Sequence, residues 1–277
     1  MKITSQIKKQ EDGTIELTVT VPWSAIVEAK KEVINEHVKE AELPGFRKGM
    51  APLEKVEQSL DKAHIKEDIL RKILPGAYAE AVKTNALNPI ISPKIHVQKI
   101  DDDKDWEFIA QTCEMPKIDL GNYKEGVQNV TAKSKIVVPG KENQAVSFDE
   151  IAKALLESVK LIVPKVILDQ EVERLLAQTL DEIKRLGLTL DQYLASSGKT
   201  IEALRADYAK KAESDVKIEF ILGQIANEQN IKVEESEIEE AIKAAKTEEE
   251  RKSLTNNKYL VASIIRQQKT LDYLRNL

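Results

Sequence analysis

The sequence predicts an α+β protein with an N-terminal two-layer ββαααββ domain, an extended linker, and a C-terminal all-α domain with elongated helical arms. In residues 1–115 the apolar positions change from alternate spacing to helical spacing and back again, whereas from residue 147 onward the spacing is helical throughout. Between these parts, residues 116–146 collect prolines and glycines among polar residues, a composition typical of a linker. We therefore expect three parts with these boundaries.

Composition narrows the class of protein. A chain of 277 residues is long enough for about two domains. With 32% charged residues and a net charge of −5, it does not resemble a protein that binds nucleic acid through bulk positive charge. Cys113 is its only cysteine, which excludes internal disulfides and cysteine-rich metal sites. The start lacks the apolar core of a signal peptide and no apolar run has membrane-spanning length, so we expect a cytoplasmic protein without a membrane partner.

The elements of the N-terminal domain follow from its periodicity. Asp12-Gly13 is a turn signal between two strand-like runs, and the second run alternates apolar with polar residues. A helical stripe begins near residue 24, and after Pro52 come a short and a long helix, followed by two more strands. Trp106 and Phe108 lie on the same side of the last strand, where we expect them to anchor the helices to the sheet. The expected ranges are 2–10 and 14–21 for the first strands, 64–85 for the long helix, and 90–99 and 105–114 for the last strands.

The linker and the helical domain are predicted with similar signals. Within the linker, residues 127–130 and 136–138 are interpreted as short strand-like pieces. Ser147 and Glu150 form a capping box, so a helix is expected to begin there. The expected helices after it cover about 168–186, 200–230, 234–247 and 254–277, with a turn region before Gly198 and a second capping box at Thr247 and Glu250.

No residue pattern indicates catalysis or metal binding. His37, His64 and His96 are far apart, and none has a metal-ligand spacing. The acidic residues of segment 101–105 lack the glycine and closing glutamate of a calcium loop, so we interpret them as a turn. Cys113 falls in a strand and is expected to be a small buried residue rather than a nucleophile. We therefore predict no catalytic residue, no metal and no cofactor.

The most unusual stretch is residues 43–52, which hold two prolines and two glycines. Prolines discourage a helix and glycines accept positive φ, so the stretch is predicted to form a tight loop between helices. The loop would present Phe46, Arg47 and Lys48, a combination suited to docking on a surface that carries phosphate and carboxylate. The alternative is an ordinary corner between helices, with Phe46 folded back into the core.

The run from Gly45 to Pro52 resembles the G-F-R-x-G-x-x-P signature of trigger factor, the bacterial chaperone at the ribosomal exit tunnel. The resemblance implies that residues 1–115 bind the ribosome near the exit tunnel, through its protein or its rRNA phosphate. The implied ribosome-binding residues are Gly45, Phe46, Arg47, Lys48, Gly49 and Pro52.

One feature of the family is not found. Trigger factors usually carry an FKBP-like isomerase domain, which needs about 100 residues and an aromatic-lined pocket. Residues 116–146 are too short for it, and Tyr123 is their only aromatic residue. The chain therefore resembles a form without that domain, and no enzyme activity is expected.

The leading functional hypothesis is an ATP-independent chaperone that holds nascent or unfolded polypeptides through aliphatic patches on residues 147–277. Weak self-association is left open. The alternative is a ribosome-docked interaction or assembly factor with one dedicated protein partner. The residues expected to contact clients are Leu168, Val172, Leu175, Leu176, Ile201, Leu204, Tyr208 and Phe220.

Overall fold

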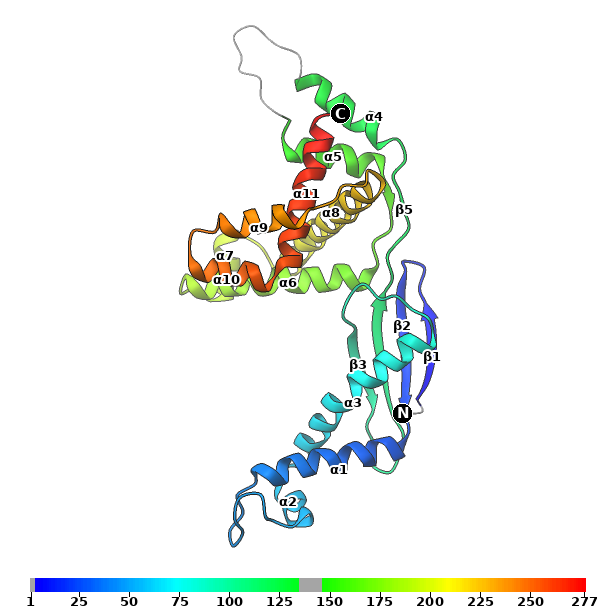
Figure 1. Cartoon of the computed structure of the whole chain (residues 1–277), viewed down its shortest axis with the longest axis vertical. Helices are drawn as coiled ribbons and strands as arrows, with labels where there is room; N and C mark the ends of the chain where they lie inside the picture. Colours follow the sequence, from blue (N-terminus) through cyan, green and yellow to red (C-terminus); the bar gives the residue numbers. More distant parts are fainter. Residues whose placement is uncertain (1–2, 135–145) are drawn as a thin grey trace. The chain divides into compact units, whose positions relative to one another are not determined.

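The computed structural model describes residues 3–134 and 146–277, and the chain divides into two compact units (Figure 1). The first unit comprises residues 1–115 together with Pro164–Ile167, and the second comprises residues 116–163 and 168–277. The described residues are mixed helix and antiparallel sheet, as the predicted α+β class requires.

The first unit contains a four-stranded antiparallel sheet in the order β1-β2-β4-β3. Alternation in β2 places every second side chain on one face, so Leu17 and Val19 are fully buried. In the register of β2 and β4, Leu17 lies opposite Ala110, and Val19 lies opposite Phe108. The strands are β1 (Thr4–Lys9), β2 (Thr14–Val21), β3 (Lys94–Lys99) and β4 (Trp106–Cys113).

Three helices complete this unit: α1 (Trp23–Glu40), α2 (Leu53–Ser59) and α3 (Lys62–Thr84). The apolar stripes of α1 and α3 pack on the buried face of the sheet, which makes two layers with one core. Trp106 and Phe108 belong to that core, as predicted. The order ββαααββ predicted for residues 1–115 is confirmed. The core helix residues include Ile26, Ala29 and Val33 of α1, and Ile65, Ile69, Ile73, Ala77 and Ala81 of α3.

A short segment from later in the chain completes the first unit at the β1–β2 turn. The backbone amide of Lys165 donates a hydrogen bond of 2.7 Å to Oδ2 of Asp12. The amide and hydroxyl of Thr14 donate to the same carboxylate, at 3.0 and 2.9 Å. Burial alone would raise the pKa of Asp12, but these hydrogen bonds outweigh it and lower the pKa below its ordinary value.

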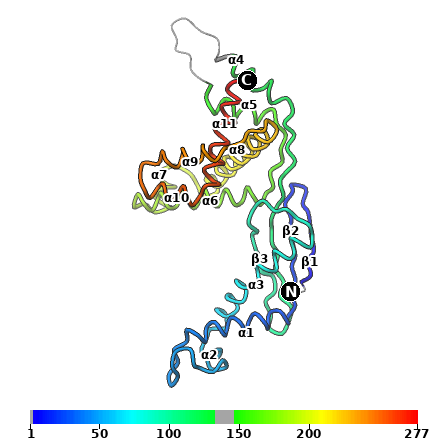
Figure 2. The backbone as a smooth tube through the Cα atoms, in the orientation of Figure 1, coloured from blue at the N-terminus to red at the C-terminus, as the bar shows by residue number. Residues whose placement is uncertain are grey.

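The described part of the second unit is helical apart from one short antiparallel pair, β5 (Ile118–Asp119) with β6 (Lys160–Leu161). Its larger core gathers α4, α5, the C-terminal part of α8 and the end of α11, and a smaller core joins α9 to α11. Figure 2 traces the backbone through these helices. Their bounds are α4 (Tyr123–Ser134), α5 (Phe148–Ser158), α6 (Lys165–Arg185), α7 (Leu190–Ser197), α8 (Ile201–Glu228), α9 (Glu235–Lys243), α10 (Glu248–Asn256) and α11 (Lys258–Arg275).

The prediction of an extended linker over 116–146 is wrong for its described part. Residues 127–130, expected as a strand-like piece, lie inside helix α4, and Tyr123, Val127 and Thr131 are buried at helical spacing. Gly126 misled the sequence interpretation because glycine usually interrupts a helix. Here it allows α4 to lie close to α5, since a Cβ at this position would collide with the hydroxyl of Ser158. The strand-like piece expected at 136–138 lies outside the described residues.

Two boundaries in the helical part also differ from prediction. The expected turn region before Gly198 contains α7, which begins at a capping box of Thr189 and Gln192. The expected last helix over 254–277 is two helices, because α10 ends at Asn256 and α11 begins at Lys258. The capping boxes predicted at Ser147 and Thr247 are both confirmed. None of the helices within residues 3–134 and 146–277 has both the length and the apolar character needed to cross a membrane.

Candidate functional site

The loop over residues 41–52 joins α1 to α2 and consists of two consecutive β-turns. The amide of Phe46 donates to the carbonyl of Leu43 at 3.0 Å, and the amide of Met50 donates to the carbonyl of Arg47 at 2.9 Å. Gly45 and Gly49 occupy the third position of each turn, with φ of +86° and +76°, a conformation that a type II turn requires there. A Cβ on Gly49 would lie 3.2 Å from the carbonyl oxygen of Lys39, so this position has little room for a side chain.

This loop exposes the residues predicted to dock. The Phe46 residue is 42% exposed, and Arg47 and Lys48 are exposed beside it. Lys48 lies 3.8 Å from Glu42, with both side chains in solvent, so this pair is weak. Arg47 has no ion pair with any residue that the structure describes. The alternative of Phe46 folded back into the core does not occur, whereas Ala51 and Val56 point inward and are buried.

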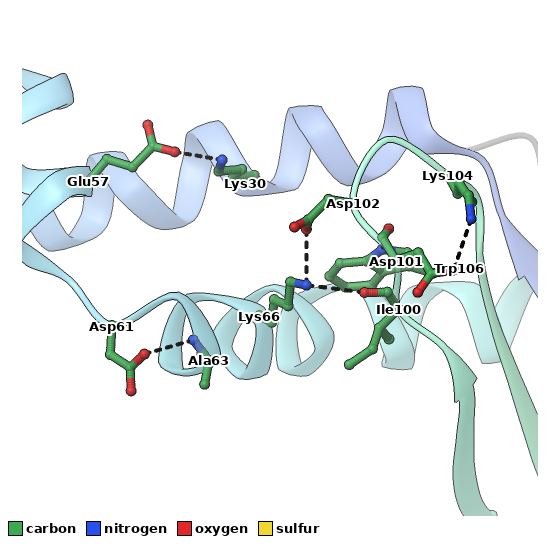
Figure 3. A network of polar contacts seen from close by, with 10 residues as sticks. All are labelled: Lys30, Glu57, Asp61, Ala63, Lys66, Ile100, Asp101, Asp102, Lys104 and Trp106. Carbon is green, nitrogen blue, oxygen red and sulfur yellow. Dashed lines mark hydrogen bonds and ion pairs between the residues drawn. The ribbon is translucent and has the colours of Figure 1, made fainter.

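The elements on either side of the loop are braced by ion pairs. Nζ of Lys30 lies 2.6 Å from Glu57 and links α1 to α2 (Figure 3). His37, near the end of α1, places Nε2 at 2.8 Å from Oδ2 of Asp68 on α3. His64 lies 3.9 Å from the same carboxylate, so two of the three histidines lie against one acidic residue.

The acidic segment 101–105 forms a turn rather than a cation site. Lys66 of α3 pairs with Asp102 at 3.0 Å and donates to the carbonyl of Ile100 at 3.3 Å (Figure 3). Asp101 pairs with Lys104, and its carbonyl accepts a hydrogen bond from the indole of Trp106. The hydrogen bond and the charge of Lys66 lower the pKa of Asp102. Within the described part of the chain, no cluster of three or more histidine, cysteine or acidic side chains is arranged to hold a metal ion.

Cys113 lies at the end of β4 and is fully buried. Burial, with a smaller contribution from the charge of Asp12, raises the pKa of its thiol to about 11. A thiol of this kind is protonated and shielded at neutral pH, so it does not act as a nucleophile.

The structure divides the eight residues predicted to contact clients into three groups. Leu175 and Leu204 are buried, so packing within the unit occupies them. Ile201 is exposed at the first turn of α8. The hydroxyl of Tyr208 lies 2.6 Å from Oγ1 of Thr179, a contact that joins α8 to α6. The half-buried residues are Leu168, Val172, Leu176, Tyr208 and Phe220.

An apolar groove in the second unit is a better candidate client site, and the sequence analysis missed it. The groove has a volume of about 650 Å³ and lies between α5, α8 and α11. Phe148 lines it and is 41% exposed. Its apolar residues are Phe148, Ala152, Leu156, Ile218, Leu222 and Leu271, and its polar residues are Asp149, Lys153, Ser214, Asp215, Glu219 and Gln267.

Exposed apolar residues on α11 extend this groove. Leu260 and Ile264 are exposed, and at helical spacing they share a face with Gln267 and Leu271, which line the groove. The residues predicted to contact clients did not include Ile218 and Leu222 of α8. Two sequence features could have indicated the groove: a second apolar stripe on α8, and Phe148 directly after the N-cap Ser147.

Comparison with known proteins found matches to one family. A family model described as "Bacterial trigger factor protein (TF)" matches residues 1–146, and one described as "Bacterial trigger factor protein (TF) C-terminus" matches residues 140–276. Trigger factors of Staphylococcus epidermidis and Macrococcus caseolyticus are 34% identical to the chain over 122 and 149 residues, which are 44% and 54% of its length. These matches span only 28% and 34% of the two relatives' own lengths.

A solved structure described as "Promiscuous Substrate Recognition in Folding and Assembly Activities of the Trigger Factor Chaperone" has a related fold. It matches with a TM-score of 0.61 at 13% identity, over 98% of this chain and 99% of that one. At this identity the likeness concerns the fold alone. The two family models together cover residues 1–276, and so the chain belongs to the bacterial trigger factor family.

Proposed function

We propose that the protein is an ATP-independent, ribosome-associated chaperone of the cytoplasm that holds nascent or unfolded polypeptides. The observation that carries the proposal is the loop over residues 41–52, which exposes Phe46 beside Arg47, a residue without an ion pair to residues 3–134 or 146–277. Leaving an aromatic ring and a guanidinium together in water is consistent with a surface that another molecule covers. Membership of the trigger factor family supports the ribosome as that molecule.

The chemistry of the loop supports a weak, reversible dock. A guanidinium binds a carboxylate or a phosphate through two parallel hydrogen bonds, so Arg47 suits ribosomal protein or rRNA. Complete burial of a phenylalanine side chain contributes about 1.5–3 kcal/mol. With only Arg47 and Lys48 supplying charge, binding should weaken as salt increases.

The groove between α5, α8 and α11 supports the holding of clients. Five of its six apolar lining residues are aliphatic, and the exposed side chains of Phe148, Leu260 and Ile264 add apolar surface. Unfolded chains expose apolar side chains that such a surface can cover. When the client folds, it buries these side chains in its own core and leaves the surface. Release therefore needs no nucleotide. The same exposed surface would also support weak self-association, which analytical ultracentrifugation over a range of protein concentrations tests directly.

We also propose that the chain has no prolyl isomerase activity. The two family models overlap at residues 140–146, so no stretch between them is left for a further domain of about 100 residues. A refolding assay limited by proline isomerisation tests this part of the proposal. Acceleration of refolding at catalytic concentrations of the protein would contradict it.

The docking proposal is tested by co-sedimentation with ribosomes. The variant Phe46→Ala/Arg47→Ala/Lys48→Ala should lose binding while its unfolding curve stays unchanged, because these side chains are exposed. A matched control removes one exposed aromatic residue and two exposed cations elsewhere: Arg251→Ala/Lys252→Ala/Tyr259→Ala. The control should bind as the parent does. Retained binding by the first variant would refute the role of the loop.

A factor with one dedicated partner remains the competing hypothesis for the second unit. An assay that measures how well the protein suppresses the aggregation of several unrelated unfolded proteins separates the two functions. A chaperone should protect most of them, whereas a dedicated factor should protect none or one.

A further inference from the structure

The loop over residues 41–52, here called the docking loop, carries a second exposed apolar side chain besides Phe46. The family signature does not account for it. Met50 is 75% exposed, although methionine is usually buried. It occupies one of the variable positions of G-F-R-x-G-x-x-P. Leu53, at the start of α2, is exposed three residues later, so Phe46, Met50 and Leu53 present apolar groups on one short stretch.

The two turns place Met50 and Phe46 in equivalent positions. Each is the fourth residue of its turn, and each donates its amide to the carbonyl three residues earlier. In the sequence, Phe46 precedes Arg47 and Lys48, and Met50 follows them. Phe46, Arg47 and Met50 are therefore exposed on one loop of two turns.

Met50 is also the most exposed sulfur-containing residue among residues 3–134 and 146–277. Cys113 is fully buried, and burial raises the pKa of its thiol to about 11, so it is mostly protonated at neutral pH. Met115 is the other exposed methionine of the described residues, at 58%, and it lies outside the docking loop. Among the described residues there are thus two exposed methionines, one inside the loop over residues 41–52 and one outside it.

We propose that Met50 is an apolar contact of the docking surface and that its oxidation by a peroxide weakens attachment to the ribosome. The thioether sulfur gives two electrons to the peroxide, whose O–O bond breaks. One oxygen atom is bonded to sulfur as the sulfoxide, and the other leaves as water when the peroxide is hydrogen peroxide. The inference rests on the proposed ribosome docking and adds to it a modification site and a redox dependence.

The size of the effect follows from burial of the side chain. Covering a methionine side chain contributes about as much as covering leucine or phenylalanine, whereas a sulfoxide is polar and loses most of that gain. Affinity for ribosomes should fall roughly tenfold or more on oxidation. The change is reversible, because sulfoxide reductases regenerate the thioether.

The test uses the full chain with hydrogen peroxide as the oxidant, removed before ribosomes are added. Binding is measured by co-sedimentation for the parent, Met50→Leu and the matched control Met115→Leu, each with and without peroxide. Peptide mass mapping measures oxidation at each methionine. The oxidised parent and oxidised Met115→Leu should bind about tenfold or more weakly than the same proteins without peroxide, whereas peroxide should leave the binding of Met50→Leu, whatever its untreated affinity, unchanged. Treatment of the oxidised parent with sulfoxide reductases should restore binding.

Two results would overturn this inference alone: unchanged binding of parent protein oxidised at Met50, or an equal loss of binding by oxidised Met50→Leu. Without oxidant, Met50→Gln should already bind more weakly than Met50→Leu, and equal binding by these two variants would also contradict the contact. Failure of the untreated parent to bind ribosomes would instead overturn the proposed docking, and this inference with it.

Discussion

Lys165 donates its backbone amide to the carboxylate of Asp12 over 2.7 Å, although 153 positions separate the two residues. The same carboxylate accepts two hydrogen bonds from Thr14, so one side chain closes the β1–β2 turn and holds a later segment against it. Gly13 has a φ of +90° in this turn, a conformation that glycine adopts without steric cost. Residues 1–115 therefore form the complete first unit only together with Pro164–Ile167.

The first prediction concerns the pH dependence of this contact. Asp12→Asn should lower the free energy of unfolding at pH 7 by about 1 kcal/mol, because a partly exposed charged acceptor is lost. The folded state lowers the pKa of Asp12 from its ordinary value of 3.8, so the ionised carboxylate stabilises the fold above that value. The contribution should disappear as the pH falls through the lowered pKa. Urea unfolding between pH 7 and pH 2 measures it, with Glu11→Gln as the control, and a difference independent of pH would contradict the assignment.

The second prediction concerns the contact of α4 with α5. Gly126→Ala should destabilise the protein by about 1–3 kcal/mol, because the new methyl group collides with the hydroxyl of Ser158. In a Ser158→Ala background the collision is removed, since the remaining Cβ lies 3.6 Å away, an ordinary contact distance. There the same change should be neutral, or stabilising by up to about 1 kcal/mol, because alanine favours a helix. A double-mutant cycle in urea that shows no coupling would refute this account of Gly126.

The third prediction separates packing from client contact on α8. Leu204 is buried, so Leu204→Ala should lower the free energy of unfolding by about 2–5 kcal/mol. Ile201 is exposed one turn earlier, and Ile201→Ala should cost less than about 1 kcal/mol. Chemical denaturation measures both variants. Equal costs would mean that the burial of α8 in solution differs from the structure.

The fourth prediction tests the groove. Phe148→Ser should raise the chaperone concentration needed to suppress aggregation by about fivefold or more, because it removes an exposed apolar side chain that lines the groove. Leu186 is 74% exposed outside the groove, so Leu186→Ser is the matched control and should leave suppression unchanged. Both variants should keep the parent's unfolding midpoint. Equal losses of activity by Phe148→Ser and Leu186→Ser would indicate nonspecific apolar binding instead of a defined site.

Local signals in the sequence predicted most of the elements. Alternation along residues 14–21 identified a strand with one buried face, and the capping boxes at Ser147 and Thr247 set two helix starts to the residue. The exposed loop also follows from local chemistry, because its prolines and glycines determine the turns. The capping box at Thr189 was equally local, and the helix after it could have been predicted.

Tertiary contacts explain what the sequence could not show. Gly126 reads as a helix breaker in isolation, and only the neighbouring Ser158 reveals it as a site of close helix packing. The groove is lined by residues of α5, α8 and α11, whose adjacency no local pattern encodes. For the same reason Leu175 and Leu204 were expected to meet clients, although the fold of the second unit buries them.

The two backbone-closed turns of the docking loop have an evolutionary consequence. Their course depends on Gly45 and Gly49 and on amide–carbonyl bonds, whereas the side chains of residues 46, 47, 48 and 50 contribute little to it. Mutations at these four positions can therefore change the charge of the loop and its affinity for a partner without changing the backbone conformation. Such a loop can adjust to a changing receptor by single substitutions, each tolerated by the rest of the protein.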